Sequence, residues 1–277
     1  MSTAAQGQVK KYSLGLVPRA LTVGEIADLG LKPYTLSDPA SRDVAATSGE
    51  SPGVDLRTRS GMPTVYDQGG LGSCMAQALC GAVAISLYQG DRGPSTLYEY
   101  YQTRALMGQV ELDEGSTTYH ALLALKNGVC PTLIWPYVER RCKKQPRRGR
   151  SARVNCYFQA KTCRLVEATT LAHTVEDITR ALDEGRPVVI TFPVYDSFYS
   201  LSETFVISMP TEDELKRAAK AGHAVVIVGY RPLERLFIVR NSWGKAYADN
   251  GHVMFPYDFV TTYAWDLICL TDIFVEQ

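Results

Sequence analysis

The two halves of this 277-residue chain carry different hydrophobic patterns, and this difference limits the folds open to it. Apolar residues recur at helical spacing in segments that begin at Ser73, Pro94 and Thr118. Thr174–Glu184 is the last segment with helical spacing. Strand-like runs follow at 187–192, 223–230, 235–240, 251–256 and 265–274. Helices followed by strands favour an α+β fold with two lobes and a functional cleft between them.

Three ranges follow from this pattern. Residues 1–53 are rich in Ser, Ala, Gly and Pro, and we expect an N-terminal extension there rather than a domain. Residues 54–155 form the predicted helical lobe, and residues 156–277 form the predicted β-rich lobe.

Composition excludes some classes of partner. Lys+Arg and Asp+Glu both number 29, so overall basicity gives no argument for binding nucleic acid or a membrane. No apolar run is long enough to span a bilayer, and the N-terminus lacks the apolar core of a secretory signal. We therefore expect a cytoplasmic monomer, with secretion by a non-classical route left open.

The stretch Gln68-Gly-Gly-Leu-Gly-Ser-Cys74 carries the clearest chemical signal. A cysteine in the first turn of a helix lies at the positive end of the helix dipole, which stabilises a thiolate. The side-chain N–H groups of Gln68 and the backbone N–H of Cys74 could together hold a developing oxyanion. A buried structural cysteine would give the same local pattern.

Two residues of the later half favour the catalytic interpretation. His223 begins one strand-like run, and Asn241 closes the next. Antiparallel strands joined by a turn can place these two side chains next to each other. A nucleophilic thiolate needs an imidazole, and that imidazole needs a hydrogen-bond acceptor to orient it.

These motifs resemble those of the papain-like cysteine proteases, in the family's order from about Val54 to Phe274. A compact bacterial and viral branch of the family is the most similar. The resemblance implies a helical lobe, an antiparallel β-barrel-like lobe and an active-site cleft between them. It rests on Asp67-Gln-Gly-Gly-Leu-Gly-Ser-Cys74, Gly128-Val-Cys-Pro131, Trp135-Pro-Tyr137, His223-Ala-Val-Val-Ile-Val-Gly-Tyr230, Asn241-Ser-Trp-Gly244 and Asn250-Gly251.

The resemblance also implies roles. Cys74 would be the nucleophile, His223 its partner and Asn241 the residue that orients the imidazole. Gln68 would complete the oxyanion hole, and Trp243 would shield the His–Asn hydrogen bond from water.

Trp243 and two further positions would also contact the substrate, which would be a peptide or protein. Gly115 falls where the family pairs a glycine backbone with an extended peptide, although the alignment is uncertain by one residue. Ala224 would line the pocket for the second side chain before the scissile bond. No cofactor or metal is implied.

Two other functions remain open. One is a thiol acyltransferase or deamidase that uses the same Cys–His pair on an amide. The other is a non-catalytic binding module that has kept the fold.

The extension ends directly before the start of the resemblance at Val54. We expect part of it to lie over the cleft and to restrain Cys74, which would make the enzyme autoinhibited. A flexible tail for secretion or targeting is the alternative.

Arg140–Arg153 contains eight basic residues and no acidic one. A solvated loop explains this run, and a weak site for an anion or nucleotide is the alternative, because arginine matches phosphate geometry. A zinc site built from Cys142, Cys156, Cys163 and His173 has no standard spacing. A disulfide among Cys130, Cys142, Cys156 and Cys163 cannot be assigned from the sequence.

Overall fold

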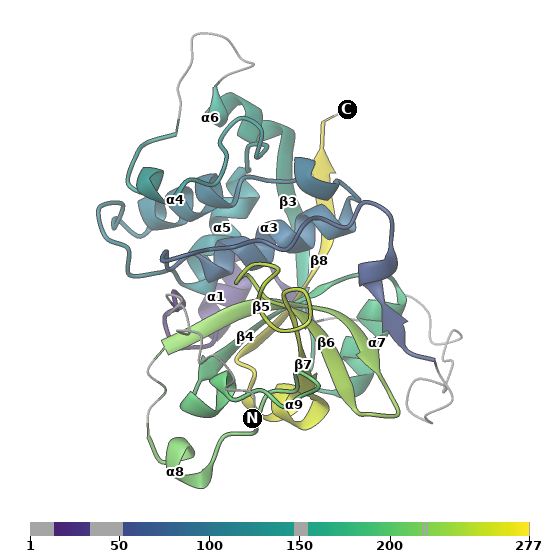
Figure 1. Cartoon of the computed structure of the whole chain (residues 1–277). Coiled ribbons are helices and arrows are strands. Elements are labelled where there is room, and N and C mark those ends of the chain that lie inside the picture. Colours follow the sequence, from purple (N-terminus) through teal and green to yellow (C-terminus); the bar gives the residue numbers. More distant parts are fainter. Residues whose placement is uncertain (1–13, 34–51, 147–154, 218, 220, 277) are drawn as a thin grey trace, which may run out of the picture.

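A computed structural model shows α3, α4 and α5 packed together against a large sheet, with α7, α8 and α9 around the strand-rich part (Figure 1). The structure describes residues 14–33, 52–146, 155–217, 219 and 221–276. The helices are α1 (Val23–Asp28), α3 (Cys74–Ser86), α4 (Thr96–Leu106), α5 (Thr118–Asn127), α6 (Cys156–Gln159), α7 (Val175–Asp183), α8 (Glu212–Leu215) and α9 (Tyr257–Tyr263). The strands are β1 (Lys32–Pro33), β2 (Val54–Asp55), β3 (Cys163–Thr170), β4 (Val188–Val194), β5 (Ala221–Arg231), β6 (Leu236–Arg240), β7 (His252–Pro256) and β8 (Asp266–Val275).

Helix α3 is the centre of the helical half. Every residue from Cys74 to Ile85 is buried, because α4 and α5 cover one side of the helix and β5 covers another. The neighbouring helices begin and end where the sequence predicts. Ser95 caps α4 with its side chain, Thr117 caps α5, and Gly128 ends α5 with a φ of 109°.

The eight strands form one sheet in the order β1-β3-β8-β4-β5-β6-β7, with β2 paired to β5. All pairs are antiparallel except β1 with β3. The α+β prediction is confirmed, but the expected barrel-like closure is not observed. The terminal strands β1 and β7 are not paired with each other in the described ranges, so the sheet stays open.

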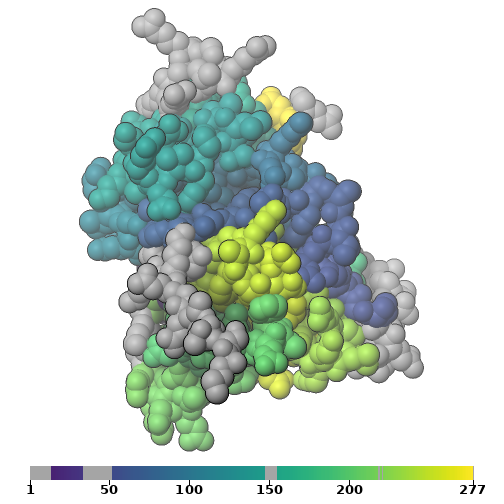
Figure 2. All heavy atoms as spheres, viewed as in Figure 1, coloured from purple at the N-terminus to yellow at the C-terminus, as the bar shows by residue number. Residues whose placement is uncertain are grey.

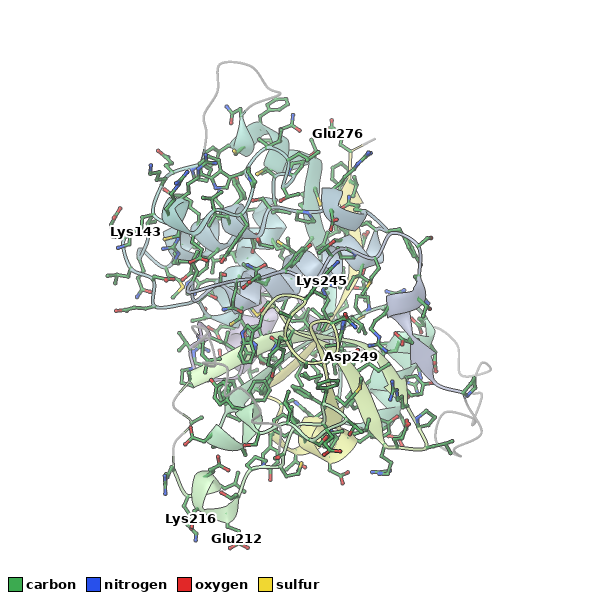
Figure 3. The ribbon with its side chains drawn as sticks, in the orientation of Figure 1. Lys143, Glu212, Lys216, Lys245, Asp249 and Glu276 are labelled. Atoms are coloured by element: carbon green, nitrogen blue, oxygen red, sulfur yellow. The ribbon has the colours of Figure 1, made fainter. Side chains whose placement is uncertain are left out.

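The space-filling view shows the helical half resting on the strand-rich half (Figure 2). The loop between β6 and β7 lies where the two halves meet. Lys245 and Asp249, which belong to this loop, are labelled in Figure 3. Strand β2 lies on the strand-rich half, although the chain then enters the helices. Among the described helices, none is long and apolar enough to cross a membrane.

Part of the N-terminal extension is folded against this body. Helix α1 begins with a capping box formed by Thr22 and Glu25, and β1 adds two residues to the edge of the sheet. Leu16, Leu29 and Leu31 are all buried in the core. The domain boundaries at residues 54 and 156 stay predictions.

Candidate active site

Cys74 is the first residue of α3 and has no exposed surface. Its thiol faces the backbone N–H groups of Gly15 and Ala224, in addition to those of its own helical turn. These N–H groups favour the thiolate, but complete burial has the larger effect and raises the pKa of the Cys74 thiol. In this covered state the cysteine is therefore a neutral thiol at pH 7.

His223 and Asn241 lie next to each other at one end of the β5–β6 pair. His223 is the third residue of β5, and Asn241 follows the last residue of β6. The Nε2 of His223 and the Oδ1 of Asn241 are 2.9 Å apart, so the amide oxygen accepts the ring N–H. Burial lowers the pKa of His223 to about 4, against the opposing effect of the Asn241 hydrogen bond. Nδ1 is buried and has no hydrogen-bond partner in the described part of the chain.

Aromatic rings explain why the imidazole is so strongly desolvated. Trp243 stacks on His223 with ring centroids 5.2 Å apart. Phe192 and Phe198 approach the same imidazole edge-on, at 5.8 and 6.2 Å. Tyr199 stacks on Trp243 with centroids 6.0 Å apart and is 45% exposed, so it forms the outer layer. The cover excludes water from the His–Asn hydrogen bond and strengthens it.

Gln68 is held by the residue that follows Asn241. Its backbone N–H donates to the carbonyl of Ser242 at 2.8 Å, and its Oε1 accepts from the Ser242 hydroxyl at 2.6 Å. Its Nε2 donates to the carbonyl of Leu71 at 2.9 Å. The Tyr137 hydroxyl donates to the Gln68 carbonyl, also at 2.9 Å. These contacts fix the orientation of the Gln68 carboxamide. Its N–H groups then lie next to the loop that leads to Cys74.

The N-terminal segment, residues 14–17, lies between the two halves. The N–H of Leu16 donates to the carbonyl of Gly222 at 3.3 Å, and the N–H of Gly222 donates to the carbonyl of Leu16 at 3.0 Å. On the other side, the N–H of Ser116 donates to the carbonyl of Gly15 at 2.7 Å. The N–H of Val17 donates to the carbonyl of Ser116 at 2.9 Å. Leu16 therefore forms one β-bridge with Gly222, the residue before His223, and another with Ser116, the residue before the cap of α5.

Three glycines allow the segment to come this close. A Cβ added to Gly15 would lie 1.9 Å from the carbonyl oxygen of Gly72, and one added to Gly115 would lie 2.0 Å from the oxygen of Gly15. Both distances are far shorter than real contacts, so any larger residue would force the backbones apart. The segment covers Cys74 as a result.

Contacts farther along the chain hold the segment in place. The carboxylate of Asp266 accepts the N–H of Leu21 at 2.9 Å. The other polar contacts are Tyr119 to Asp28 at 2.5 Å, Lys126 to the carbonyl of Leu29 at 2.6 Å, and Lys32 to Glu167 at 2.6 Å.

Comparison with known proteins agrees with this geometry. Residues 51–261 match the model of a family described as papain family cysteine protease. This chain belongs to the papain family of cysteine proteases. It is accordingly a cysteine peptidase, a hydrolase that acts on a peptide or protein substrate.

Individual relatives support the same assignment. An uncharacterised peptidase C1-like protein of Acanthamoeba polyphaga mimivirus is 34% identical over 224 residues, which are 74% of this chain and 69% of the viral protein. Xylellain, a cysteine protease from Xylella fastidiosa, is 28% identical with a TM-score of 0.76, covering 97% of this chain and 98% of xylellain. The predicted similarity to a bacterial and viral branch is confirmed. Procathepsin B S9 from Trypanosoma congolense is 17% identical with a TM-score of 0.65, covering 94% and 87%, and shares the fold.

The papain-family fold brings together the residues predicted for catalysis. Cys74, Gln68, His223 and Asn241 come from two loops and two secondary-structure elements, and all are buried around one point between the halves. Trp243 covers the imidazole, as the resemblance implies.

Gly115 and Ala224, which are predicted together with Trp243 to bind substrate, also lie at this point. Ala224 is buried beside the Cys74 thiol. Gly115 lies against the N-terminal segment, but the hydrogen bonds to that segment come from the backbone of Ser116, the next residue. Their roles toward a substrate stay predictions.

Sequence reasoning missed three residues that shape the site. Leu16 is inserted between the halves, Ser116 pairs with it, and Ser242 holds Gln68. The position of Ser242 directly after Asn241 was the available signal for its role. No local signal pointed to Leu16, because its partners are about 100 and 200 residues away along the chain.

The cysteines other than Cys74 show no second site. All seven cysteines lie in the described ranges, are buried and form no disulfide there. Within the ranges that the structure describes, no group of three or more His, Cys, Asp or Glu side chains could hold a metal ion.

Proposed function

We propose that this protease cleaves peptide bonds through Cys74 and His223, and that residues 14–17 of its own chain hold it inactive. The observation that carries the catalytic part is the His223–Asn241 pair, whose ring nitrogen and amide oxygen are 2.9 Å apart, directly before Ala224, whose backbone N–H faces the Cys74 thiol. Asn241 fixes the imidazole with its Nε2–H directed at the amide oxygen. Nδ1 is then the ring nitrogen that accepts the proton of the Cys74 thiol.

The reaction would proceed in two steps. His223 takes the thiol proton, and the Cys74 sulfur attacks the carbonyl carbon of the scissile bond. The oxyanion receives hydrogen bonds from the Gln68 side chain and the Cys74 backbone N–H. His223 then protonates the leaving amine, and the C–N bond breaks to leave an acyl-enzyme. Water, deprotonated by His223, attacks the acyl carbon and releases the acid and the free thiol.

The inhibitory part rests on how the segment lies against the thiol. The N–H of Gly15 faces the sulfur, whereas a substrate must present a carbonyl carbon there. The segment therefore covers the site without being placed for attack.

Product analysis tests the catalytic proposal against an acyltransferase or deamidase. A mixture of unmodified peptides is incubated with the protein lacking residues 1–19 and is analysed by mass spectrometry. We expect pairs of fragments whose masses sum to the parent plus one water, and no product from the Cys74→Ala variant. Intact peptides in which a side-chain amide has taken up water and released ammonia to become a carboxyl group, or which have gained an acyl group, would instead support the alternative chemistry. No change, together with no adduct at Cys74 from a peptidyl epoxide, would favour a binding module.

We also propose an anion site at the basic run. Arg140, Lys143 and Lys144 are exposed in the described part, and Lys143 lies at the outer edge of the helical half (Figure 3). Residues 147–154 lie outside the described residues. Binding of AMP should weaken steeply as salt rises, because phosphate contacts release counterions. Undetectable or salt-insensitive binding in a titration at 50 and 200 mM salt would contradict this proposal.

Residence in the cytoplasm and a monomeric state complete the proposal. Both proposals rest on the amino-acid sequence, which lacks an apolar run long enough to span a bilayer and the apolar core of a secretory signal. Gel filtration with light scattering tests the second.

A further inference from the structure

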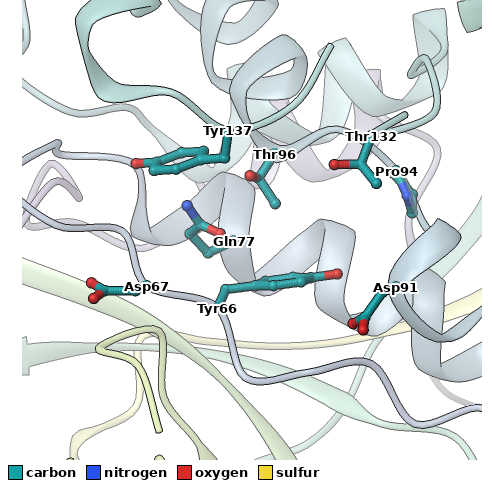
Figure 4. Close-up of a pocket in the computed structure, with 8 residues that line it drawn as sticks. All are labelled: Tyr66, Asp67, Gln77, Asp91, Pro94, Thr96, Thr132 and Tyr137. Carbon is teal, nitrogen blue, oxygen red and sulfur yellow. The ribbon is translucent and has the colours of Figure 1, made fainter. Parts of the chain in front are cut away.

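A pocket of about 220 Å³ lies beside α3 and the residues that directly precede Gln68. Tyr66, Gln77 and Tyr137 form its walls, and we call it the lateral pocket. Gln77 follows Cys74 by one helical turn. Figure 4 shows the Gln77 carboxamide between the rings of Tyr66 and Tyr137, with Asp67 and Asp91 at opposite ends. Residues 14–17 do not line this pocket.

The Gln77 carboxamide lines the lateral pocket, and only its nitrogen is paired, with Ser73 and Tyr137. Gln77 is 3% exposed, and its Nε2 donates to the Ser73 hydroxyl at 3.3 Å, but no described residue donates to its Oε1. Tyr66 and Thr96 also line the pocket. Buried polar groups are normally satisfied, so the Gln77 Oε1 suits a bound ligand that replaces water.

The charge of the lateral pocket favours a cation. Asp67 and Asp91 line it, and no basic residue does. The closest guanidinium that contacts a wall is that of Arg240, which lies 5.1 Å from the centre of the Tyr66 ring. Arg240 donates to the carbonyls of Pro63 and Thr64, so it is engaged outside the pocket. The lining itself therefore carries two carboxylates and no cation.

The walls are also rigid enough to be a site. The Asp91 carboxylate accepts the N–H of Thr64 at 2.7 Å and its hydroxyl at 2.9 Å, and the Asp67 carboxylate accepts the N–H of Gly69 at 2.9 Å. Tyr137 is held by hydrogen bonds to Ser73 and to the Gln68 carbonyl. Side chains held in this way lose little freedom when a ligand binds.

We propose that the lateral pocket binds a small organic cation, through a guanidinium or primary ammonium group. The carboxylates would take its N–H groups, the Gln77 Oε1 would accept one hydrogen bond, and the two tyrosine rings would contact the cation by their faces. The group could belong to a free metabolite or to a basic side chain of a peptide.

Titration calorimetry on the full-length Cys74→Ala protein tests this at low ionic strength, where no turnover occurs. Agmatine represents the free cation, and the tripeptide Gly-Arg-Gly represents the side chain. We expect agmatine to bind with a Kd of about 1 mM or below. If agmatine binds more tightly than Gly-Arg-Gly, the ligand is a free metabolite, and if Gly-Arg-Gly binds more tightly, it is a peptide side chain. The neutral analogue 1-pentanol should bind at least about tenfold more weakly.

Variants then locate the binding. Asp91→Asn keeps the size of the side chain and an oxygen for Thr64, and it should weaken agmatine binding by roughly tenfold. Gln77→Leu should weaken it by a smaller factor, and it serves as a second variant if the first does not fold. Asp258→Asn, at an exposed ion pair with Arg235, should bind agmatine as the parent does.

Two results would overturn the proposal. One is that agmatine gives no heat and no shift in melting temperature. The other is that its affinity is unchanged in both pocket variants, which would place the cation elsewhere. Neither result depends on peptidase activity.

Discussion

Deleting residues 1–19 is expected to raise kcat/KM for a peptide substrate by about two orders of magnitude. The deletion removes Leu16, whose burial contributes about 2 kcal/mol, and the four backbone hydrogen bonds to Gly222 and Ser116, which contribute about 1 kcal/mol each at most. Each 1.4 kcal/mol corresponds to roughly a tenfold change in the open fraction, and the cost of ordering the segment offsets part of the sum. The deletion leaves α1, β1 and the buried Leu29 and Leu31 in place, so the fold should persist.

The matched control is a deletion of residues 1–13, which keeps every contact of Leu14–Val17. It should leave kcat/KM near that of the full chain. The single substitution Leu16→Asp should behave as the longer deletion does, because a carboxylate cannot be buried at that position without a partner. Equal kcat/KM for the two deletions, with both proteins folded by circular dichroism, would refute inhibition by residues 14–17.

The pH behaviour of the thiol provides a second readout of the same deletion. In the covered state, burial raises the pKa of Cys74 and lowers that of His223 to about 4. Both groups are therefore neutral between about pH 4 and the raised pKa of the thiol. Removing the cover reduces both desolvation effects, so the pKa of Cys74 should fall and that of His223 should rise. Thiolate absorbance near neutral pH should appear in the longer deletion and be absent from the full chain.

The elements that the sequence predicts well are those with local start and stop signals. Thr117 and Gly128 bound α5, and the matching cap at Thr174 precedes α7. The β5–β6 pair could be predicted because both runs are strongly apolar and a turn at Pro232 joins them. This pairing is also what brings His223 to Asn241, so the centre of the site followed from the same pattern.

Long-range contacts explain what the sequence did not predict. Strand β3 was missed because charged residues interrupt it, and its pairing with β8 shifts register around Glu167. Helix α9 was missed because it is a short run of aromatic and β-branched residues that disfavour a helix locally. The open sheet depends on where β1 and β7 end, and no local pattern reports this.

The same limit applies to the cleft. The expected position of the extension over the cleft was a hypothesis from chain order. Gly15 and Leu16 carry no local signal of their partners, since Gly72, Ser116 and Gly222 are brought to them only by the tertiary fold.

Substitutions of the catalytic residues should have the largest effects of all, measured in the protein that lacks residues 1–19. Cys74→Ala removes the nucleophile, and His223→Ala removes the proton carrier, so each should lower kcat by about 10⁴-fold or more. Gln68→Ala should cost about 10²-fold, because one donor to the oxyanion is lost while the Cys74 N–H remains. The double variant Cys74→Ala, His223→Ala should be no slower than either single variant, since the two groups act as one unit.

Asn241 and Cys80 complete the series. Asn241→Ala removes the acceptor 2.9 Å from Nε2 and should lower kcat more than it raises KM, because the imidazole loses its orientation. Cys80 is as fully buried as Cys74 and lies on the same helix, so Cys80→Ala tests whether loss of any buried thiol has the same effect. Cys80→Ala should retain activity within about threefold, because it removes little volume and no reacting atom. Activity that survives Cys74→Ala but falls in Cys80→Ala would move the nucleophile from the helix start and refute the proposed mechanism.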